Sequence, residues 1–392
     1  MTVMASLRGA AATVGIGEAA GGTATGKTAV QLQAEAIKAA LDDAGVTKEA
    51  IDGLISSSPD AEPHHMWSAF LAEYLGLRLR YSAAVQLGGA TAHANLIHAA
   101  SVLATGQAEM VLVVDGDNRA TRFSDKVGAM ASQIGRLDSL DPGHEFDAPF
   151  GPTVPGMYAL LARRHMHEFG TTPEQLAAIA VAARKHGALH PNAQLRKPVT
   201  VAEVLASPLI ADPIHRDECA LVSDWGGAIL LATAARARTL RLDPVLVLGW
   251  GQAHQGYNPS QAPSLTALPI RDSAREAYAM GGVGPEGIQA AEIYDSFTIT
   301  ALLALEDLGF CEKGEGGRFV EGGRIELGGE LPVNTHGGLL SYNGGHSHFL
   351  IEGVRQLRGE AGERQVPGAR AILSQGTAAM GSSSFTLILG RG

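Results

Sequence analysis

The chain has 392 residues, of which 45% are apolar and 18% are charged, and its net charge at pH 7 is −10. This is the composition of a globular protein with room for two core-sized units, and the negative charge disfavours a general nucleic-acid binder. Two cysteines, Cys219 and Cys311, are too few for a disulfide framework or an intrachain cysteine-based zinc site. The sequence shows no signal-peptide pattern and no apolar run of about 18 residues, so we expect a cytoplasmic protein without a membrane span.

The first elements in chain order alternate between helix and strand. Residues 27–56 predict an amphipathic helix, a turn at Gly45 and a strand. The segment from Val85 to Asn118 predicts a strand, a tight turn at Gly88-Gly89, a second helix and a buried strand. The region 121–215 has a different character, with helical stretches between loop signals. Strand character then returns before residue 242.

Residues 271–294 repeat the scheme of residues 27–56. Five positions of the first segment match five of the second at one constant offset: Ala40, Gly45, Val46, Glu49 and Ile51 with Ala277, Gly282, Val283, Glu286 and Ile288. The repeat predicts two related α/β halves, residues 1–242 and 243–392, with 121–215 as an excursion from the first.

The motifs and their order resemble the thiolase superfamily, in its sterol-carrier type. The segments that carry the resemblance include GGATAHANLIHAASVLATGQAEMVLVV, EIYDSFTITALLALEDLGFCEKGEGG and PVNTHGGLLSY. The resemblance implies a thiolase fold, in which two βαβαβ halves form five layers (α/β/α/β/α) and a loop domain is inserted in the first half.

The chain departs from thiolases at the nucleophile. Thiolases place a cysteine at the N-terminus of the helix after the first tight turn, where the helix dipole stabilises a thiolate. This sequence has Gly89 there, and the loops that resemble the other catalytic loops contain no cysteine either. Without a nucleophile the enzyme cannot form a covalent acyl-enzyme.

A cysteine-less subgroup resembles this chain in that respect, namely the lipid-transfer-protein-like aldolases that cleave β-hydroxyacyl-CoA side chains of steroids. The resemblance implies a retro-aldol reaction with Tyr294 and Tyr342 as catalytic groups. It also implies an obligate complex with a small, separately encoded protein built from an OB-fold and a zinc ribbon. We expect a homodimer through the first-half strands that flank Met110 to Val114, which with the partner gives a heterotetramer.

Retro-aldol cleavage needs a base for the β-hydroxyl, a group that stabilises the thioester enolate, and an acid for the enolate carbon. Backbone N–H groups of two glycine-rich turns, Gly88-Gly89 and Gly376 to Gly381, are candidates for the enolate oxygen. His346 and His348 lie in the loop that resembles the oxyanion-hole loop of thiolases, and either one fits the catalytic role. His93, Asn334 and His336 are candidate substrate contacts, with a structural role as the alternative.

Coenzyme A binding is implied by the resemblance. Arg163, Arg164 and Lys185 supply basic groups in the loop domain, although solvated helix faces explain them equally well. We expect an acyl-CoA substrate, no further cofactor and no metal. Two other functions remain open: an acyltransferase or thiolase with non-standard catalytic residues, and a non-catalytic acyl-CoA or lipid-binding subunit.

Overall fold

The computed structural model describes residues 7–123, 147–150, 153–241, 243–256 and 258–391. Part of the predicted loop domain, residues 124–146, lies outside the described residues. The first half contains β1 (Ala11–Glu18), α2 (Ala29–Ala44), β2 (Gly53–Ser56), α3 (Trp67–Leu75), β3 (Tyr81–Ala84), α4 (Thr91–Ala104), β4 (Met110–Asn118), α5 (Arg119–Phe123), α8 (Val154–Phe169), α9 (Pro173–Leu189), α10 (Val201–Ala206), β5 (Leu209–Ala211), β6 (Ile214–His215), β7 (Asp224–Thr233) and α11 (Ala234–Leu240). The second half contains β8 (Val245–His254), α12 (Ile270–Gly281), β9 (Ala290–Ile293), α13 (Thr298–Asp307), α14 (Gly316–Phe319), α15 (Gly338–Ser341), α16 (His348–Arg358), β10 (Ala371–Ala378) and β11 (Ser383–Arg391).

The strands of the two halves follow the same order. The first half reads β3-β2-β4-β7-β1 and the second reads β9-β10-β11-β8. Thus β1, β2, β4 and β7 correspond to β8, β9, β10 and β11. A single parallel bridge from Val333 to Ala291 stands where β3 pairs with β2 in the first half. The two sets are joined into one nine-stranded sheet by a short antiparallel contact, Ala12 with Leu246 and Thr13 with Val245.

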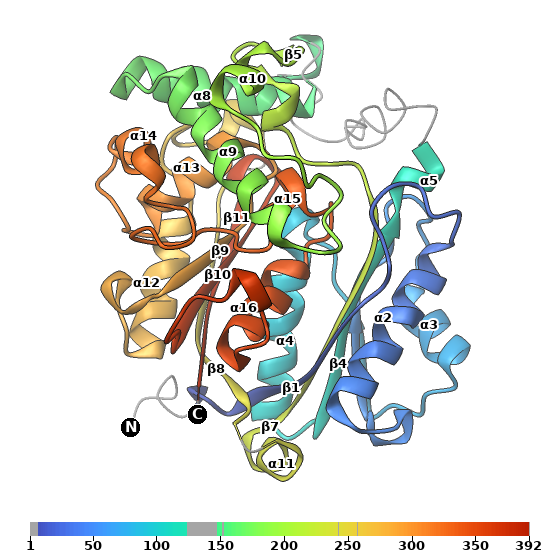
Figure 1. The fold of residues 1–392 in the computed structure, drawn as a ribbon. Helices are drawn as coiled ribbons and strands as arrows, with labels where there is room; N and C mark the ends of the chain where they lie inside the picture. Colours follow the sequence, from blue (N-terminus) through green and yellow to red (C-terminus); the bar gives the residue numbers. More distant parts are fainter. Residues whose placement is uncertain (1–6, 124–146, 151–152, 242, 257, 392) are drawn as a thin grey trace.

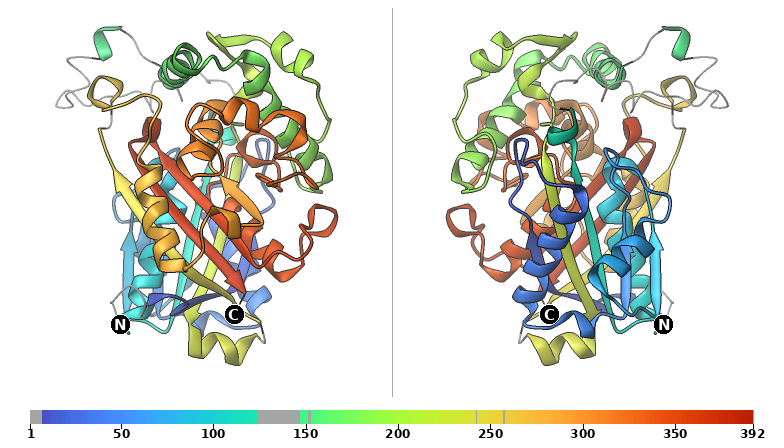
Figure 2. Two further views of the ribbon diagram at one scale, coloured as in Figure 1. Left: turned by 90° about the vertical axis from the view of Figure 1, so that its left-hand side faces the viewer. Right: turned by 90° about the vertical axis from the view of Figure 1, so that its right-hand side faces the viewer.

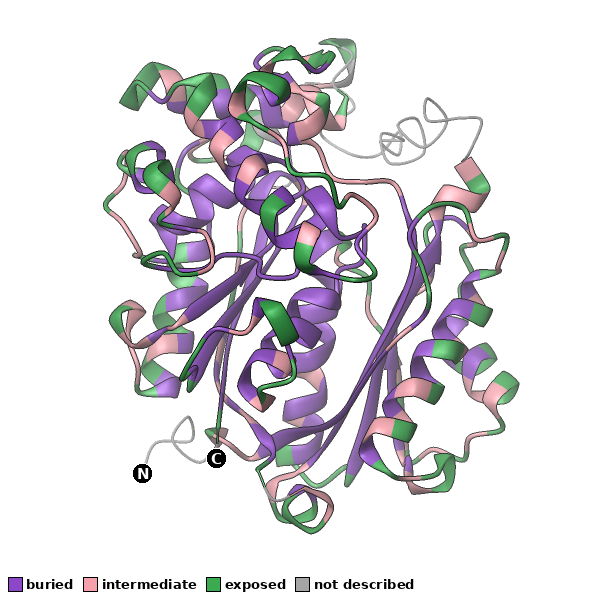
Figure 3. Ribbon diagram, viewed as in Figure 1, coloured by how far each residue is buried: buried purple, intermediate pink, exposed green. Residues whose placement is uncertain are grey.

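Helices cover both outer faces and fill the space between the halves (Figures 1 and 2). Helices α2 and α3 pack on the outer face of the first half, and α12 packs on β8 and β11 of the second. Helices α4 and α16 lie between the halves, where each contacts strands of both. Their residues share one buried apolar cluster. Figure 3 shows that most of the ribbon of both helices is buried. These five layers confirm the predicted thiolase fold, and the domain boundary near residue 242 stays a prediction.

The repeat seen in the sequence has a physical counterpart in how each helix meets its strand. Helices α2 and α12 both end at a left-handed glycine, Gly45 at φ 67° and Gly282 at φ 62°. Gly17 in β1 and Gly251 in β8 let these helices approach closely. A Cβ on Gly17 would overlap the carbonyl oxygen of Ala36, and one on Gly251 would overlap that of Ser273. The same helix-on-strand contact is therefore built twice.

Helices α8, α9 and α10 are the main helices of the described part of the region 121–215, and they lie above the second half in Figure 1. Helix α9 packs against α13 and α15. Threonine caps begin each of the three helices, since the side chains of Thr153, Thr172 and Thr200 accept backbone N–H groups of the first turn. In the described part of the chain, no helix combines the length and the apolar run needed to cross a bilayer.

Candidate active site

The loop that carries a cysteine in thiolases is a tight turn leading into α4. Gly88 has φ 53°, and Gly88 to Ala90 form a short 3₁₀ turn. The Thr91 hydroxyl donates to the carbonyl oxygen of Gly88 at 2.7 Å and accepts the N–H of Leu87 at 2.9 Å. Gly89 is thereby fixed at the N-terminal end of α4, where it is buried.

The side chain of Tyr294 occupies the space above Gly89. A Cβ built on Gly89 would lie 2.5 Å from Cε2 of Tyr294 and would overlap its Cζ and hydroxyl oxygen. Van der Waals contact begins at a separation of roughly 3.4 Å or more, so a cysteine and this position of the phenol exclude each other. The glycine is therefore a requirement of the site: it makes room for Tyr294.

The loop after β9 holds Tyr294 in that position. The N–H of Tyr294 donates to the carbonyl oxygen of Gln375 at 3.0 Å. The backbone of Asn334 has φ 53°. Its side-chain oxygen accepts the N–H of Ile293 at 2.6 Å, and its side-chain nitrogen donates to the carbonyl oxygen of Ile293 at 2.8 Å. Asp295 accepts the N–H of Leu339 at 2.8 Å, and burial raises the pKa of Asp295 to about 7. Asn334, predicted as a substrate contact with a structural role as the alternative, holds the end of β9 with both ends of its amide.

The two candidate histidines lie beside different tyrosines. The ring of His346 is 6.0 Å from the ring of Tyr294 and 5.5 Å from that of Trp225. The ring of His348 is 4.9 Å from that of Tyr342, edge to face. Burial, reinforced by the charge of Arg119, lowers the pKa of His346 to about 3, so its imidazole is neutral at pH 7. His346 also lines a narrow pocket with Asp115, Arg119 and Trp225.

Tyr342 lies in a polar cluster of its own. Its hydroxyl donates to Glu18 Oε1 at 2.9 Å, and its ring lies 4.2 Å from that of His190. His336 and Phe349 separate this cluster from Tyr294. The ring of His336 is 5.6 Å from Tyr342 and 5.1 Å from Phe349, and Phe349 is 6.2 Å from Tyr294. That both hydroxyls reach one substrate stays a prediction.

Both tyrosines are neutral phenols in this environment. Burial raises the pKa of Tyr294, the phenol of Tyr158 adds to this effect, and Arg119 opposes it. Burial also raises the pKa of Tyr342, and the carboxylate of Glu18 raises it further. At rest both groups are therefore hydrogen-bond donors, and a tyrosine that removes a proton needs a partner that takes its own.

Two residues predicted as substrate contacts, His336 and His93, are buried and contact other side chains of the same chain. His336 Nδ1 lies 2.8 Å from Glu292 Oε2, and burial lowers the pKa of His336 to about 3. His93 Nε2 lies 2.8 Å from the Ser374 hydroxyl, and His93 is fully buried. A Cβ on Gly376 would lie 2.5 Å from His93 Nδ1. The sequence did not indicate that His336 and His93 are held by Glu292 and Ser374.

The glycine-rich turn predicted at Gly376 to Gly381 begins later than the sequence predicted. Gly376 is inside β10, paired with Phe385 of β11, and is not part of the turn. The turn begins at Ala379, because the ladder between the two strands continues to Ala378. Met380 has φ 51°, and its N–H donates to the Tyr158 hydroxyl at 3.1 Å. Gly381, with φ 80°, is in the turn as predicted.

The basic residues predicted for coenzyme A are each paired with an acid. Arg163 contacts Asp212, Arg164 lies 2.6 Å from Glu168, and Lys185 lies 2.7 Å from Glu326. All three side chains are about half exposed. A role in phosphate binding would require these pairs to open, and it stays a prediction.

The two cysteines are poor nucleophiles. Burial raises the pKa of Cys219 and of Cys311 to about 12. A thiol with that pKa holds almost no thiolate at pH 7. Neither residue therefore replaces the missing cysteine at Gly89.

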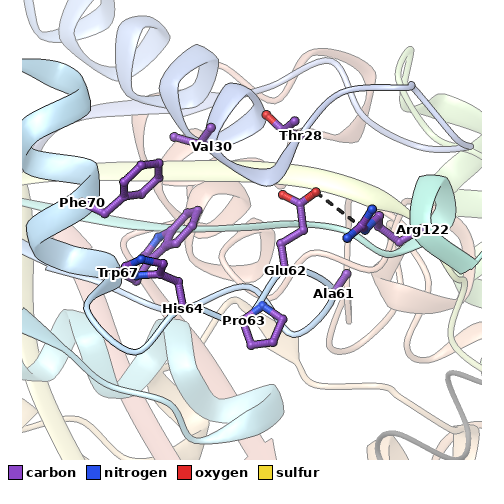
Figure 4. A pocket seen from close by; sticks show the side chains of 9 residues that line it. All are labelled: Thr28, Val30, Ala61, Glu62, Pro63, His64, Trp67, Phe70 and Arg122. Carbon is purple, nitrogen blue, oxygen red and sulfur yellow. Dashed lines mark ion pairs between the residues drawn. The ribbon is translucent and has the colours of Figure 1, made fainter.

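A separate pocket of about 440 Å³ lies outside the tyrosine site (Figure 4). It is open to the surface between the start of α2, the loop before α3, and α3 itself. Arg122 and Glu62 face each other in it at 3.7 Å. Its lining is Thr28, Val30, Ala61, Glu62, Pro63, His64, Trp67, Phe70 and Arg122, and none of these was predicted as a site residue.

Glu18 and Arg119 are two charged residues near the tyrosines that the sequence did not indicate. Each stands at or just beyond the end of an apolar strand, β1 and β4 respectively. A charged residue at the carboxyl end of a buried strand is a usable signal, because ligands of α/β proteins bind at that edge.

Comparisons with known proteins support the thiolase fold. Residues 251–391 match the family described as Thiolase C-terminal domain-like. The chain is 36% identical to a 17-hydroxy-3-oxo-4-pregnene-20-carboxyl-CoA lyase from Mycobacterium tuberculosis, over 98% of this chain and 100% of the relative. It is 34% identical to an acetyl-CoA acetyltransferase from Methanothermobacter thermautotrophicus, over 91% and 93% of the two chains.

Among solved structures, an Ltp2-ChsH2(DUF35) aldolase matches with a TM-score of 0.86 and 34% identity, over 98% of both chains. In this chain the ring of Tyr294 fills the space that a side chain at position 89 would need. The chain belongs to the thiolase superfamily and, within it, to the thiolase-like aldolases.

Proposed function

We propose that this chain cleaves a β-hydroxyacyl-CoA by a retro-aldol reaction, without a covalent acyl-enzyme. The observation that carries the proposal is the position of Tyr294 over Gly89. A thiolase needs a thiolate at that point, whereas a retro-aldol reaction needs only proton transfer and a stabilised enolate.

The roles follow from the environments of the two tyrosines. Tyr342 takes the proton of the β-hydroxyl, because its own hydroxyl proton already points to a carboxylate, Glu18. Tyr294 stays protonated and donates a hydrogen bond to the thioester oxygen as the enolate forms. The turn at Gly88 and Gly89 offers backbone N–H groups on the same side. Neutral His346 lies next to Tyr294 and assists as a second polar contact.

The substrate proposed is a steroid CoA thioester with a hydroxyl at the β-carbon. The relative from Mycobacterium tuberculosis is named for 17-hydroxy-3-oxo-4-pregnene-20-carboxyl-CoA, which is a β-hydroxyacyl-CoA of this kind. Cleavage would give a 17-ketosteroid and a shortened acyl-CoA. Coenzyme A enters as part of the substrate, and the reaction needs no redox cofactor.

The proposed assembly contains a second copy of the chain and a small partner. The aldolase structure that matches this chain is a complex with a DUF35 protein. We propose a partner with an OB-fold and a zinc ribbon.

Strand β4, which includes Met110 to Val114, is fully buried between β2 and β7, while β3 is the free edge on that side. A homodimer would pair along this edge. Light scattering of the chain alone and with the partner gives the stoichiometry.

The direct test is product analysis. Incubation with 17-hydroxy-3-oxo-4-pregnene-20-carboxyl-CoA, with and without the partner, is followed by mass spectrometry of the steroid and CoA fractions. Equal amounts of ketone and shortened acyl-CoA support the proposal. Transfer of an acyl group to free coenzyme A would support the acyltransferase alternative. Tight binding without any product would support the non-catalytic subunit.

A further inference from the structure

Glu18 connects two residues of the candidate site through one oxygen atom. The Tyr342 hydroxyl donates to Glu18 Oε1 at 2.9 Å, and His348 Nδ1 lies 2.5 Å from the same oxygen. The other oxygen, Oε2, is in contact with Arg355 of α16. The side chain is only 9% exposed. A carboxylate this enclosed is held in one orientation toward the phenol.

The sheet explains why this carboxylate meets the start of α16. Glu18 in β1 and Asp115 in β4 are both in register with Gly227 of β7, one on each side. Opposed residues of neighbouring strands point to the same face. A Cβ on Gly227 would overlap the Ser347 hydroxyl. The glycine therefore admits the first turn of α16 between two carboxylates, and this brings His348 against Glu18.

We propose that Glu18 is the positioning residue that receives the proton of Tyr342 while Tyr342 takes the proton of the substrate. The inference rests on the proposed retro-aldol function. It names a residue that acts through Tyr342 and does not touch the substrate.

The step balances without any added reagent. The O–H bond of the substrate breaks and a new O–H bond forms on Tyr342, while the former phenol proton forms an O–H bond on Glu18 Oε1. The electron pair of the cleaved carbon–carbon bond moves into the thioester enolate, and the alkoxide carbon becomes the ketone carbon. The proton then returns from Glu18 through Tyr342 to the enolate carbon. Nothing is oxidised or reduced, and both groups end as they began.

The charges around Glu18 suit a proton that is held only briefly. Burial works to raise the pKa of Glu18, but the charges of Arg355 and His348 outweigh it and hold its pKa well below the usual value. The carboxylate is therefore ionised and ready to accept at neutral pH. Once protonated it is a stronger acid than an ordinary carboxyl group, which favours return of the proton. The titratable or charged groups that face it are Tyr342, His348, Arg355, His190, His336 and, across Gly227, Asp115.

The first experiment compares Glu18→Gln with Glu306→Gln on the full chain, in the assembly that cleaves 17-hydroxy-3-oxo-4-pregnene-20-carboxyl-CoA. In Glu18→Gln the amide oxygen of the new side chain still accepts from Tyr342 but binds no proton. Glu306 is a matched control, because it is also buried and lies 3.1 Å from a histidine, His165, away from the tyrosines. We expect kcat to fall by about 10² in Glu18→Gln with KM within twofold, and to be retained in Glu306→Gln. Glu18→Asp should restore part of kcat.

The second experiment uses pH, because a residue that only holds α16 in place would not alter the pH profile. The active form of Glu18 is ionised, so kcat falls as pH drops through its pKa. In the wild type Arg355 and His348 hold that pKa well below the usual carboxyl value, so kcat should stay level in mildly acidic buffer. Arg355→Met removes the main charge that lowers it, so the acid limb should move up by at least about one pH unit. Adding Glu18→Gln to Arg355→Met should abolish that limb.

The outcomes separate the two proposals. No cleavage by the wild type would defeat the proposed function. Cleavage by the wild type, with a fall in kcat for Tyr342→Phe but none for Glu18→Gln, would overturn the role of Glu18 alone. So would an acid limb that Arg355→Met does not move, or one that persists after Glu18→Gln. If Glu18→Gln does not fold, the single variant Arg355→Met still decides through the position of its acid limb.

Discussion

The two tyrosines are both buried and neutral, yet their surroundings differ. Tyr342 donates to a carboxylate that is held by Arg355 and lies against His348. The positive charge of Arg119 acts on Tyr294 and opposes the rise of its pKa. The ring of Tyr294 fills the space over Gly89. A phenol beside an ionised acceptor can pass its proton on, whereas a phenol beside a cation and a helix N-terminus is suited to donate toward a developing negative charge. The different surroundings are the reason for the roles proposed above, proton transfer for Tyr342 and enolate stabilisation for Tyr294.

Removal of either hydroxyl should have the largest effect. Tyr342→Phe and Tyr294→Phe keep the ring and its packing and delete the proton or hydrogen-bond donor. We expect kcat to fall by about 10² to 10⁴ in each variant, with little change in thermal stability. Tyr278→Phe is the matched control, because Tyr278 donates to the carbonyl oxygen of Leu308 away from the site. Wild-type rates in both site variants would refute tyrosine catalysis.

Gly89→Ala tests the contact that defines the Tyr294 side. The new methyl group would overlap the phenol, so the ring must move. A displacement of about 1 Å at a reacting group costs about 10² in rate, and we expect a loss of that size in kcat. Gly353→Ala in α16 is the control, because its Cβ would meet Ile372 and Leu389 at an ordinary 3.4 Å. Equal activity of Gly89→Ala and wild type would show that Tyr294 is not needed where it lies.

The buried histidine beside Tyr294 should make stability depend on pH. The pKa of His346 is about 3 in the folded chain and near 6.5 when unfolded, so the unfolded state binds more protons between these values. Stability is therefore full above pH 6.5 and declines as pH falls. At pH 5 the loss is about 2 kcal/mol for this residue.

Urea unfolding of the wild type and of His346→Gln at pH 7 and pH 5 measures how much of the loss in unfolding free energy is due to His346. The variant should lose about 2 kcal/mol less than the wild type between the two pH values. An equal loss in both proteins would mean that His346 titrates normally in the folded chain.

The smallest effect is expected at the cysteines. Cys219 and Cys311 lie outside both tyrosine environments, and burial keeps their thiols protonated. The double variant Cys219→Ser/Cys311→Ser should keep kcat within about twofold, with the rate of ketone formation as the readout. A loss of 10² or more would show that a thiol takes part after all.

The sequence was sufficient for the parts of the fold that depend on local pattern. The constant offset between the segments around Gly45 and Gly282 predicted the duplicated helix, turn and strand, and the structure repeats each of them. The loops with Gly89, Tyr294 and Tyr342 were found because short motifs mark them. Local pattern also explains the error at Gly376, where glycine suggested a turn but the ladder with β11 continues.

The pairings that make the site are long-range and could not be predicted. Tyr294 and Gly89 belong to different halves of the chain. They meet because β10 contacts the turn at Gly88 to Ala90 and its residue Gln375 accepts the N–H of Tyr294. The partner of Tyr342 is at the end of the first strand. Which histidine lies beside which tyrosine depends on where α16 begins. Gly227 of β7 influences that position, because it leaves room for Ser347 just before the helix.

The most direct test is a rapid-quench time course of a single turnover of 17-hydroxy-3-oxo-4-pregnene-20-carboxyl-CoA, with the intact mass of the protein followed in the same samples. Cleavage through Tyr294 and Tyr342 predicts that ketone and shortened acyl-CoA form with the same rate constant, and that the protein mass never changes. An acyl adduct on the chain, or one product formed in a burst before the other, would contradict cleavage without a covalent intermediate.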